Sequence, residues 1–298
     1  MDKEELDFLK KSGRIAGLAL NYGAKLIKSG ESVVKILDEV EKYIKDNGGD
    51  IAFPAQISIN NVAAHFCPTD ESDIVIKDDD IIKLDCGVSI NGFIADNAKT
   101  VCPSGIHDDL IKASRDALNS ALKIMKPGVE LREIGKEIHD VITSRGFAPI
   151  RNLSGHGLDR YEIHSYPTVP NFDTGDNSYL SVGDVVAVEP FASTGAGVVY
   201  ESSNCTLFTL SDEKPVRSPL TRDVLKEIKT FQGFPFTSRW LIRKFGPGKT
   251  AFALREMKVK EMLQEHPPLL DKGNGLVSQA EHSVIVGKQP LVYTRVDD

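Results

Sequence analysis

The fold is decided by the stretch LDCGVSINGFIADNAKTV, residues 84–101. Within it, Asn91 and Gly92 lie between two apolar runs. This dipeptide favours a two-residue turn, because both of its residues tolerate positive φ. The stretch therefore predicts a β-hairpin, and each of its strands carries one aspartate, Asp85 and Asp96.

The two aspartates are expected to converge. A two-residue turn pairs Gly87 with Asp96, and Asp85 lies two residues from Gly87 on the same face of the sheet. The two carboxylates are then diagonal neighbours, with Cα atoms about 7–8 Å apart. Their neighbours along the strands are apolar. The carboxylates therefore repel each other unless they are protonated, neutralised by a metal or solvated at an exposed face.

Three further segments place a metal-binding side chain beside small or apolar residues. His156 lies between two glycines, where the backbone can approach a ligand closely. Glu189 follows one apolar strand and Glu281 stands at the edge of another. Together with Asp85 and Asp96 they make a ligand set that favours Mn²⁺, Fe²⁺ or Co²⁺. The set also offers enough bridging oxygens for two metals about 3.5–4 Å apart, as in metal-assisted hydrolysis.

Hydrophobic periodicity along the rest of the chain predicts an α+β architecture. Helices are expected over residues 4–28, 33–44, 105–126 and 130–145, and strands over 81–101, 185–188 and 284–286. Residues 206–268 are helix-rich and interrupted by prolines, which indicates a helical subdomain inserted into a single domain spanning 1–298.

An internal repeat supports one pseudo-symmetric domain. Residues 28–49 align without gaps on residues 126–147, at an offset of 98 positions, and Gly30 falls on Gly128. Two amphipathic helices that end in glycine can also look alike by chance. Because the spacing between the glycines matches as well, a duplicated helix-helix-strand unit is the better interpretation.

The composition is that of an ordinary globular protein. The 298 residues include 36 Lys and Arg and 43 Asp and Glu, for a net charge of −7, and 41% are hydrophobic. These values exclude a disordered chain and argue against direct binding of nucleic acid. No apolar run approaches the roughly 20 residues that span a bilayer, and the first residues lack the apolar core of a signal peptide. Four widely spaced cysteines suggest reduced thiols in the cytoplasm.

Five segments together resemble the methionine aminopeptidases of the pita-bread fold, in particular the short archaeal form of the type II branch. They are FPAQISINNVAAHFCP (53–68), LDCGVSINGFIADNAKTV (84–101), SGHGLDRYEIH (154–164), VEPFASTGAG (188–197) and QAEHSVIV (279–286). The resemblance implies a pseudo-twofold antiparallel sheet covered by helices, with 206–268 as the type II helical insertion.

The resemblance also implies roles for the metal-binding residues. Asp85 would chelate one of two divalent ions, and Asp96 and Glu281 would bridge both. His156 and Glu189 would complete the second site. A water activated between the ions would attack the scissile carbonyl, and Glu189 would take up and return its proton. Co, Mn, Fe, Zn and Ni all suit such ligands, so the sequence does not choose among them.

Two histidines and an apolar pocket complete the implied active site. His65 would contact the scissile amide nitrogen or the leaving group, and His164 would polarise the carbonyl oxygen. His266 stands at the pocket rim, where many relatives carry Tyr. The side chains that match the methionine pocket, with ordinary core packing as the alternative for each, are Phe53, Ile163, Phe191 and Leu269.

Asn97 and Lys99 depart from the family pattern, because this stretch is more apolar or carries Thr in many relatives. Both have the strand-face parity opposite to that of Asp96. We therefore expect Lys99 to face away from the metals.

The implied function is removal of the initiator methionine from nascent polypeptides whose second residue is small. The expected enzyme is a cytoplasmic monomer with no membrane association, and contact with the ribosome would suit this role. One alternative is an Xaa-Pro aminopeptidase or prolidase, which shares the fold and ligand order. Another is a non-catalytic pita-bread protein that binds protein or RNA. The insertion and the NNVAAH segment argue against the first, and the complete ligand set argues against the second.

Overall fold

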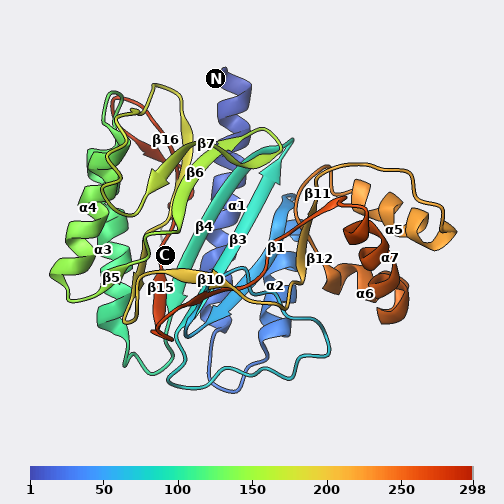
Figure 1. Ribbon diagram of the computed structural model, residues 1–298. Coiled ribbons are helices and arrows are strands. Elements are labelled where there is room, and N and C mark those ends of the chain that lie inside the picture. Colours follow the sequence, from blue (N-terminus) through green and yellow to red (C-terminus); the bar gives the residue numbers. More distant parts are fainter. Residues whose placement is uncertain (297–298) are drawn as a thin grey trace.

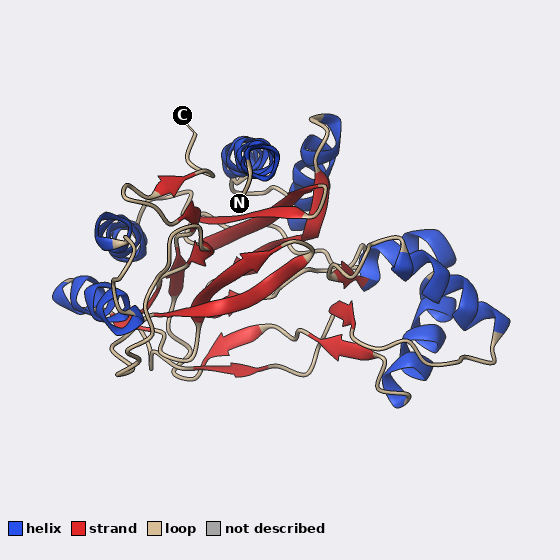
Figure 2. Ribbon diagram, turned by 90° about the horizontal axis from the view of Figure 1, so that it is seen from above, coloured by secondary structure: helices blue, strands red, loops and turns tan. Residues whose placement is uncertain are grey.

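A computed structural model describes residues 1–296 of the chain (Figure 1). In the first half of the fold, two helices cover one face of an antiparallel sheet with strand order β1-β3-β4. Figure 2 shows these helices outside the strands. The elements are α1 (Lys3–Leu26), α2 (Val33–Asp46), β1 (Asp50–Ile59), β3 (Ile82–Ile90) and β4 (Phe93–Val101).

The second half repeats this arrangement of a helix pair on strands. Helices α3 (Asp108–Ile124) and α4 (Leu131–Ser144) pack against a sheet with strand order β17-β16-β8-β6-β7 and a smaller one with order β15-β9-β5. The strands are β5 (Ala148–Pro149), β6 (Ser154–Asp159), β7 (Glu162–Pro170), β8 (Val185–Val188), β9 (Phe191–Ser193), β15 (Val277–Gln279), β16 (His282–Ile285) and β17 (Leu291–Val292).

The structure confirms the internal repeat. Helices α2 and α4 are both 14 residues long, and their bounds differ by the offset that the alignment predicted. The equivalent glycines Gly30 and Gly128 have φ values of 85° and 88°. Their N–H groups donate to the carbonyls of Ile76 and Leu180, each at 2.8 Å. The two halves are therefore copies of one unit in backbone detail, which is the basis of the pseudo-twofold fold.

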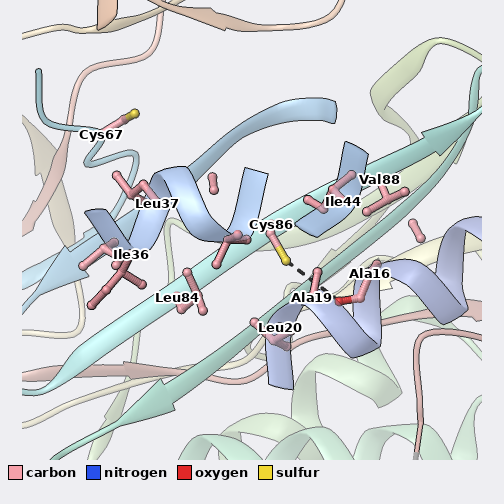
Figure 3. Close-up of a cluster of buried hydrophobic side chains, with 14 of the residues drawn as sticks. Ala16, Ala19, Leu20, Ile36, Leu37, Ile44, Cys67, Leu84, Cys86 and Val88 are labelled. Carbon is pink, nitrogen blue, oxygen red and sulfur yellow. Dashed lines mark hydrogen bonds between the residues drawn. The ribbon is translucent and has the colours of Figure 1, made fainter. Parts of the chain in front are cut away.

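The core of the first half lies between its helices and β3 (Figure 3). Leu37 of α2 and Leu84 of β3 are fully buried there, beside small residues of α1 such as Ala16. The small residues let α1 approach the sheet closely, and the Cys86 thiol contacts the Ala16 carbonyl at 4.0 Å. Because α1 and α2 pack this tightly, β3 and β4 form a rigid base for side chains on their other face.

The helices and strands between residues 207 and 265 form a smaller body that shares a hydrophobic core of its own, with its helices at the right in Figure 1. The predicted helices are present as α5 (Pro219–Lys229), α6 (Ser238–Phe245) and α7 (Pro247–Val259). They accompany a short sheet of β11 (Leu207–Leu210), β12 (Phe236–Thr237) and β13 (Leu263–Glu265), in the order β12-β11-β13. The sequence analysis did not predict these strands, because two to four residues are too few to show a period.

Buried ion pairs attach this smaller body to α2. Arg239 of α6 is fully buried, and its guanidinium donates to Asp38 and, at 2.6 Å, to Glu41. The indole N–H of Trp240 donates to the other oxygen of Glu41 at 2.9 Å. Since an unpaired buried charge costs several kcal/mol, about 3–5, these contacts fix α6 on α2.

The two halves meet where β4 runs beside β16. The Asp96 N–H donates to Ser283 Oγ at 2.8 Å, and the same hydroxyl donates to the Asp96 carbonyl at 2.7 Å. The Glu281 N–H donates to the Ala98 carbonyl at 3.0 Å. The backbone of Asp96 is thus tied to the strand that follows Glu281.

A third small sheet, with order β10-β14-β2, lies along one end of this junction. Its strands are β2 (Val62–Ala64), β10 (Val199–Glu201) and β14 (Leu269–Asp271). Within residues 1–296, no helix has the length and apolar character needed to cross a membrane.

Candidate metal centre

The hairpin of β3 and β4 has the register that the sequence predicted. Gly87 pairs with Asp96, and Ile90 pairs with Phe93 across the turn. The first turn residue, Asn91, has a positive φ of 53°. Because the register is as predicted, the carboxylate-bearing residues of β3 and β4 share one face of the sheet.

One cavity, of about 70 Å³, is lined by all of the predicted metal-binding side chains. They reach it from five places: β3, β4, β6, the residue after β8 and the residue before β16. These side chains are Asp85, Asp96, His156, Glu189 and Glu281. The cavity lies at the junction of the two halves, so both repeats contribute to it.

The distances in this cluster suit a metal centre. Nε2 of His156 lies 3.7 Å from Oδ2 of Asp96 and 3.8 Å from Oε1 of Glu189. One ligand atom from each of Asp96, His156 and Glu281 lies within 4.8 Å of the others. Three donors this close can all reach one ion.

The electrostatics of the cluster favour cations. Burial raises the pKa of Asp85 to about 7, and one of its oxygens is buried without a hydrogen-bond partner. Burial, and then the neighbouring carboxylates, raise the pKa of Asp96 and Glu281 well above the ordinary range. Burial lowers the pKa of His156 to about 3, so its imidazole is neutral and can act as a ligand. Adjacent carboxylates ionise together only when cations compensate them, so these residues fit divalent ions.

Three more histidines line the same cavity. His65 has a φ of 64°, in the left-handed region that costs a non-glycine residue energy, and its Nδ1 is buried without a partner. The ring of His266 lies 5.9 Å from the ring of His65, and its Nε2 is 2.9 Å from the Thr209 hydroxyl. The exposed His164 lies edge-on to His156, with ring centroids 4.4 Å apart.

The apolar side chains predicted for the pocket divide into two groups. Phe53 and Ile163 line the cavity. Phe191 is fully buried in a neighbouring cluster that contains Ala64, and Leu269 packs against that cluster. Phe191 and Leu269 are not among the residues that line the cavity, so a role for them in substrate binding stays a prediction.

The glycines beside His156 lie against neighbouring backbone. A Cβ at Gly155 would lie 2.3 Å from the Ala187 carbonyl oxygen, and one at Gly157 would lie 2.1 Å from that of Tyr166. These glycines allow β6 to pack against neighbouring backbone. Whether the backbone at these glycines also approaches a ligand closely stays a prediction.

Two glutamines that no sequence motif had indicated, Gln279 and Gln56, complete the site. Gln279 donates to Glu189 at 3.3 Å and to Glu281 at 3.5 Å. It lies two residues before Glu281, so strand parity could have found it. Gln56 lines the cavity and pairs with Asp85 across β1 and β3, after an irregularity in the register near Phe53. No sequence pattern indicates that irregularity.

Asn97 and Lys99 lie on the opposite side of β4, as predicted. Lys99 donates to Asn21 of α1 at 3.1 Å, and both line a second pocket. Asn97 is completely buried, and its Oδ1 accepts a contact of 3.4 Å from the Cys86 thiol.

Comparisons with known structures agree with the fold. A methionine aminopeptidase from Thermotoga maritima superposes with a TM-score of 0.73 at 21% identity, covering 99% of this chain and 98% of that one. A thermophilic Arx1 superposes with a TM-score of 0.87 at 18% identity, covering 100% of this chain and 93% of that one. Prolidase from Pyrococcus furiosus gives 0.64 at 17% identity, with 100% of this chain but 65% of that chain covered. At these identities the likeness is one of fold.

Sequence comparisons identify the family as well as the fold. The model of metallopeptidase family M24 matches residues 7–209. The methionine aminopeptidase of Pyrococcus abyssi is 39% identical over 292 residues, which is 97% of this chain and 99% of that protein. That of Methanocaldococcus jannaschii is 38% identical over 295 residues, or 99% of each. The chain therefore belongs to metallopeptidase family M24 and, within it, to the methionine aminopeptidases.

Proposed function

We propose that this protein is a metal-dependent aminopeptidase that removes an N-terminal methionine from polypeptides. The observation that carries the proposal is the meeting of four carboxylates and four histidines in one cavity between the repeated halves. Family membership supplies the reaction, and the cavity supplies the residues that perform it.

The metal ligands are assigned from their positions in the cluster. As the family resemblance implies, Asp96 and Glu281, which with His156 each offer a ligand atom within 4.8 Å of the others, would be shared between two divalent ions. Asp85 would hold one ion, and His156 and Glu189 would hold the other. The bound cations lower the pKa of a water molecule, which can then act as a nucleophile at neutral pH.

Glu189 is placed to move the proton of that nucleophile. Its carboxylate is 84% withdrawn from solvent, and Gln279 holds one of its oxygens at 3.3 Å. The other oxygen lies 3.8 Å from His156 and faces the cluster. A carboxylate fixed in this way can take the proton from the nucleophile and return it to the leaving amine.

His65 and His164 act on the peptide. His65 is held in a strained backbone conformation with one ring nitrogen unpartnered, which is typical of a residue kept in place for function. It would contact the scissile amide nitrogen. His164, beside His156 at the mouth, would stabilise negative charge on the carbonyl oxygen.

The methionine side chain would enter the apolar part of the cavity. Phe53 and Ile163 form its walls, with His266 at the rim. We keep Phe191 and Leu269 as supporting residues, because they pack behind Ala64, which lines the cavity.

Cleavage of tripeptides tests the reaction directly. With Mn²⁺, Co²⁺ or Fe²⁺ present, Met-Ala-Ser is expected to release methionine faster than Ala-Pro-Ser releases alanine, because the pocket is built for an unbranched apolar side chain. Product formation is followed by chromatography. Faster cleavage at the Xaa-Pro bond would favour the prolidase alternative, and no cleavage of either peptide would favour the non-catalytic one.

The replacement His65→Ala separates catalysis from metal binding. We expect turnover of Met-Ala-Ser to fall by about 10²-fold, the usual cost of losing one such polar group, while the metal content stays unchanged. His139→Ala, on the outer helix α4, is the matched control and should keep full activity. Metal content is measured by elemental analysis, and loss of metal from His65→Ala would show that His65 is a ligand.

The remaining assignments follow from the family and the fold. We infer one catalytic domain over 1–298 with 206–268 as an insertion that has its own core. We propose further that its substrates are nascent chains and that it is a cytoplasmic monomer that works near the ribosome. We expect no direct binding of nucleic acid or membranes.

A further inference from the structure

A buried amide behind the metal centre joins two backbone segments of the site. Asn171 follows the last residue of β7, is 1% exposed and is not among the residues that line the cavity. Its Nδ2 donates to the Leu153 carbonyl at 3.0 Å and to the Glu189 carbonyl at 3.3 Å. Leu153 precedes β6, which carries His156, and Glu189 follows β8. One side chain therefore ties together the segments that carry two of the predicted ligands.

The backbone around Asn171 is packed on both sides. Pro170, the residue before it, pairs with Ser154 in the ladder between β6 and β7, which run side by side in Figure 1. The residue after it, Phe172, lies against α4, because a Cβ added to Gly135 of that helix would be 2.1 Å from the Phe172 carbonyl oxygen. Since both neighbours are fixed, the Asn171 amide is a donor with a fixed position.

The backbone of Glu189 lies beyond the regular sheet. The last residue of β8 that pairs with β16 is Val188, and Pro190, which follows Glu189, has no N–H to donate. Gln279 holds the carboxylate of Glu189 at 3.3 Å, and Asn171 holds its carbonyl. The two amides together restrict both the side chain and the backbone of this residue.

The hydrogen bonds of Asn171 show which of its atoms the fold uses. Its Oδ1 is buried without a partner, which costs free energy that an apolar side chain of similar size would avoid. An apolar side chain would instead leave the carbonyls of Leu153 and Glu189 without this donor. The amide therefore suits this position because of its N–H groups, and both of its acceptors belong to the backbone of the site.

We propose that Asn171 is a positioning residue for the proton transfer from the nucleophile to the leaving amine that is assigned to Glu189. Its amide holds the Glu189 backbone against the segment that leads into β6, and the Glu189 carboxylate lies 3.8 Å from His156. Proton transfer requires atoms within hydrogen-bond reach, so a displaced carboxylate slows the chemical step more than it weakens substrate binding. This inference rests on the proposed aminopeptidase function.

The variant Asn171→Leu removes both N–H donors at similar side-chain volume. With Mn²⁺ at saturating concentration, we expect kcat for Met-Ala-Ser to fall by about 10- to 100-fold, while KM stays within about threefold. The matched control is Asn152→Leu. Asn152 also makes two hydrogen bonds to backbone, to the Val199 carbonyl at 2.8 Å and from the Val199 N–H at 2.9 Å. Asn152→Leu should lower the melting temperature but keep kcat within about twofold.

Metal content and melting temperature are measured on the same samples. The proposal is overturned if folded Asn171→Leu keeps the wild-type kcat, if its fall in kcat equals its loss of metal, or if Asn152→Leu shows the same fall. Asn171→Ser, whose hydroxyl is too short to span both carbonyls, replaces Asn171→Leu if that protein does not fold, and the same fall in kcat is expected. Absence of turnover in the wild type would refute the aminopeptidase function itself, whereas normal turnover in the variant refutes the role of Asn171 alone.

Discussion

Replacement of Glu281 by Ala is expected to lower kcat/KM for Met-Ala-Ser by more than about 10³-fold, or roughly 4 kcal/mol of transition-state stabilisation. The reason is its position. The Glu281 donor atom lies within 4.8 Å of those of Asp96 and His156, so one substitution removes a ligand that both ions would share. Asp96→Ala is expected to have the same effect. Initial rates are measured together with the metal content of each protein.

The control for this experiment is Glu201→Ala, which removes an exposed carboxylate of β10 outside the cavity. It should keep both its activity and its metal. Circular dichroism shows whether the Glu281 and Asp96 variants are folded. Substantial turnover in a folded Glu281→Ala protein would show that Glu281 does not bridge the ions.

Removal of divalent ions is expected to lower the melting temperature at pH 8 by roughly 5–10 °C. A ligand present at 100 times its Kd stabilises the folded state by about 2.7 kcal/mol, and each kcal/mol corresponds to about 2–4 °C in a protein of this size class. The physical cause is the repulsion among Asp85, Asp96, Glu189 and Glu281 when no cation compensates them. Differential scanning calorimetry with and without a chelator measures the effect.

The same carboxyls give this effect a pH dependence. Their pKa values are raised in the folded, metal-free protein. At a pH above the ordinary carboxyl pKa, the folded protein therefore binds more protons than the unfolded chain. The stability that they contribute is complete below that ordinary value and is lost as the pH rises through the raised values. His65 and His156, whose pKa values are lowered to about 4 and 3, act in the opposite sense, but only below about pH 6.5.

Between pH 7 and 9, burial also shifts the pKa values of Lys83, Cys67 and Cys86, so the carboxyls are isolated by the difference in melting temperature between metal-free and metal-loaded protein. The melting temperature of the metal-free protein should fall across this range relative to that of the metal-loaded protein, which serves as the control. In Asp96→Ala the fall should be smaller, because one of the coupled carboxyls is gone. This account would be contradicted if the difference in melting temperature between metal-free and metal-loaded protein did not increase from pH 7 to pH 9.

The parts of the site that the sequence predicted depend on local rules. The Asn91–Gly92 turn sets the register of β3 and β4, and this register places Asp85 and Asp96 on one face. The alternation of side chains along the strand likewise predicted that Lys99 faces away from the metal ligands, and Lys99 donates to Asn21 of α1. Each of these inferences depends only on the alternation of side chains between the two faces of a strand and on the type of one hairpin turn. The repeat was visible because both copies keep the same glycine spacing.

The parts that the sequence missed depend on contacts between distant segments. Gln56 reaches Asp85 through an irregular stretch of β1, and no periodicity predicts where such an irregularity falls. The contact of the glycines beside His156 with neighbouring backbone likewise forms only on folding. The Asn171 amide meets the Glu189 carbonyl only in the folded chain.

The reciprocal hydrogen bonds between Asp96 and Ser283 have a consequence for how the protein acquires its metal during synthesis. Asp85 and Asp96 are synthesised well before Glu281 and Ser283, which follow them far along the chain. A chain that stops short of β16 lacks one of the shared ligands and the clamp on Asp96. The group of Asp96, His156 and Glu281 therefore forms only after the segment with Glu281 and β16 has been made and has paired with β4.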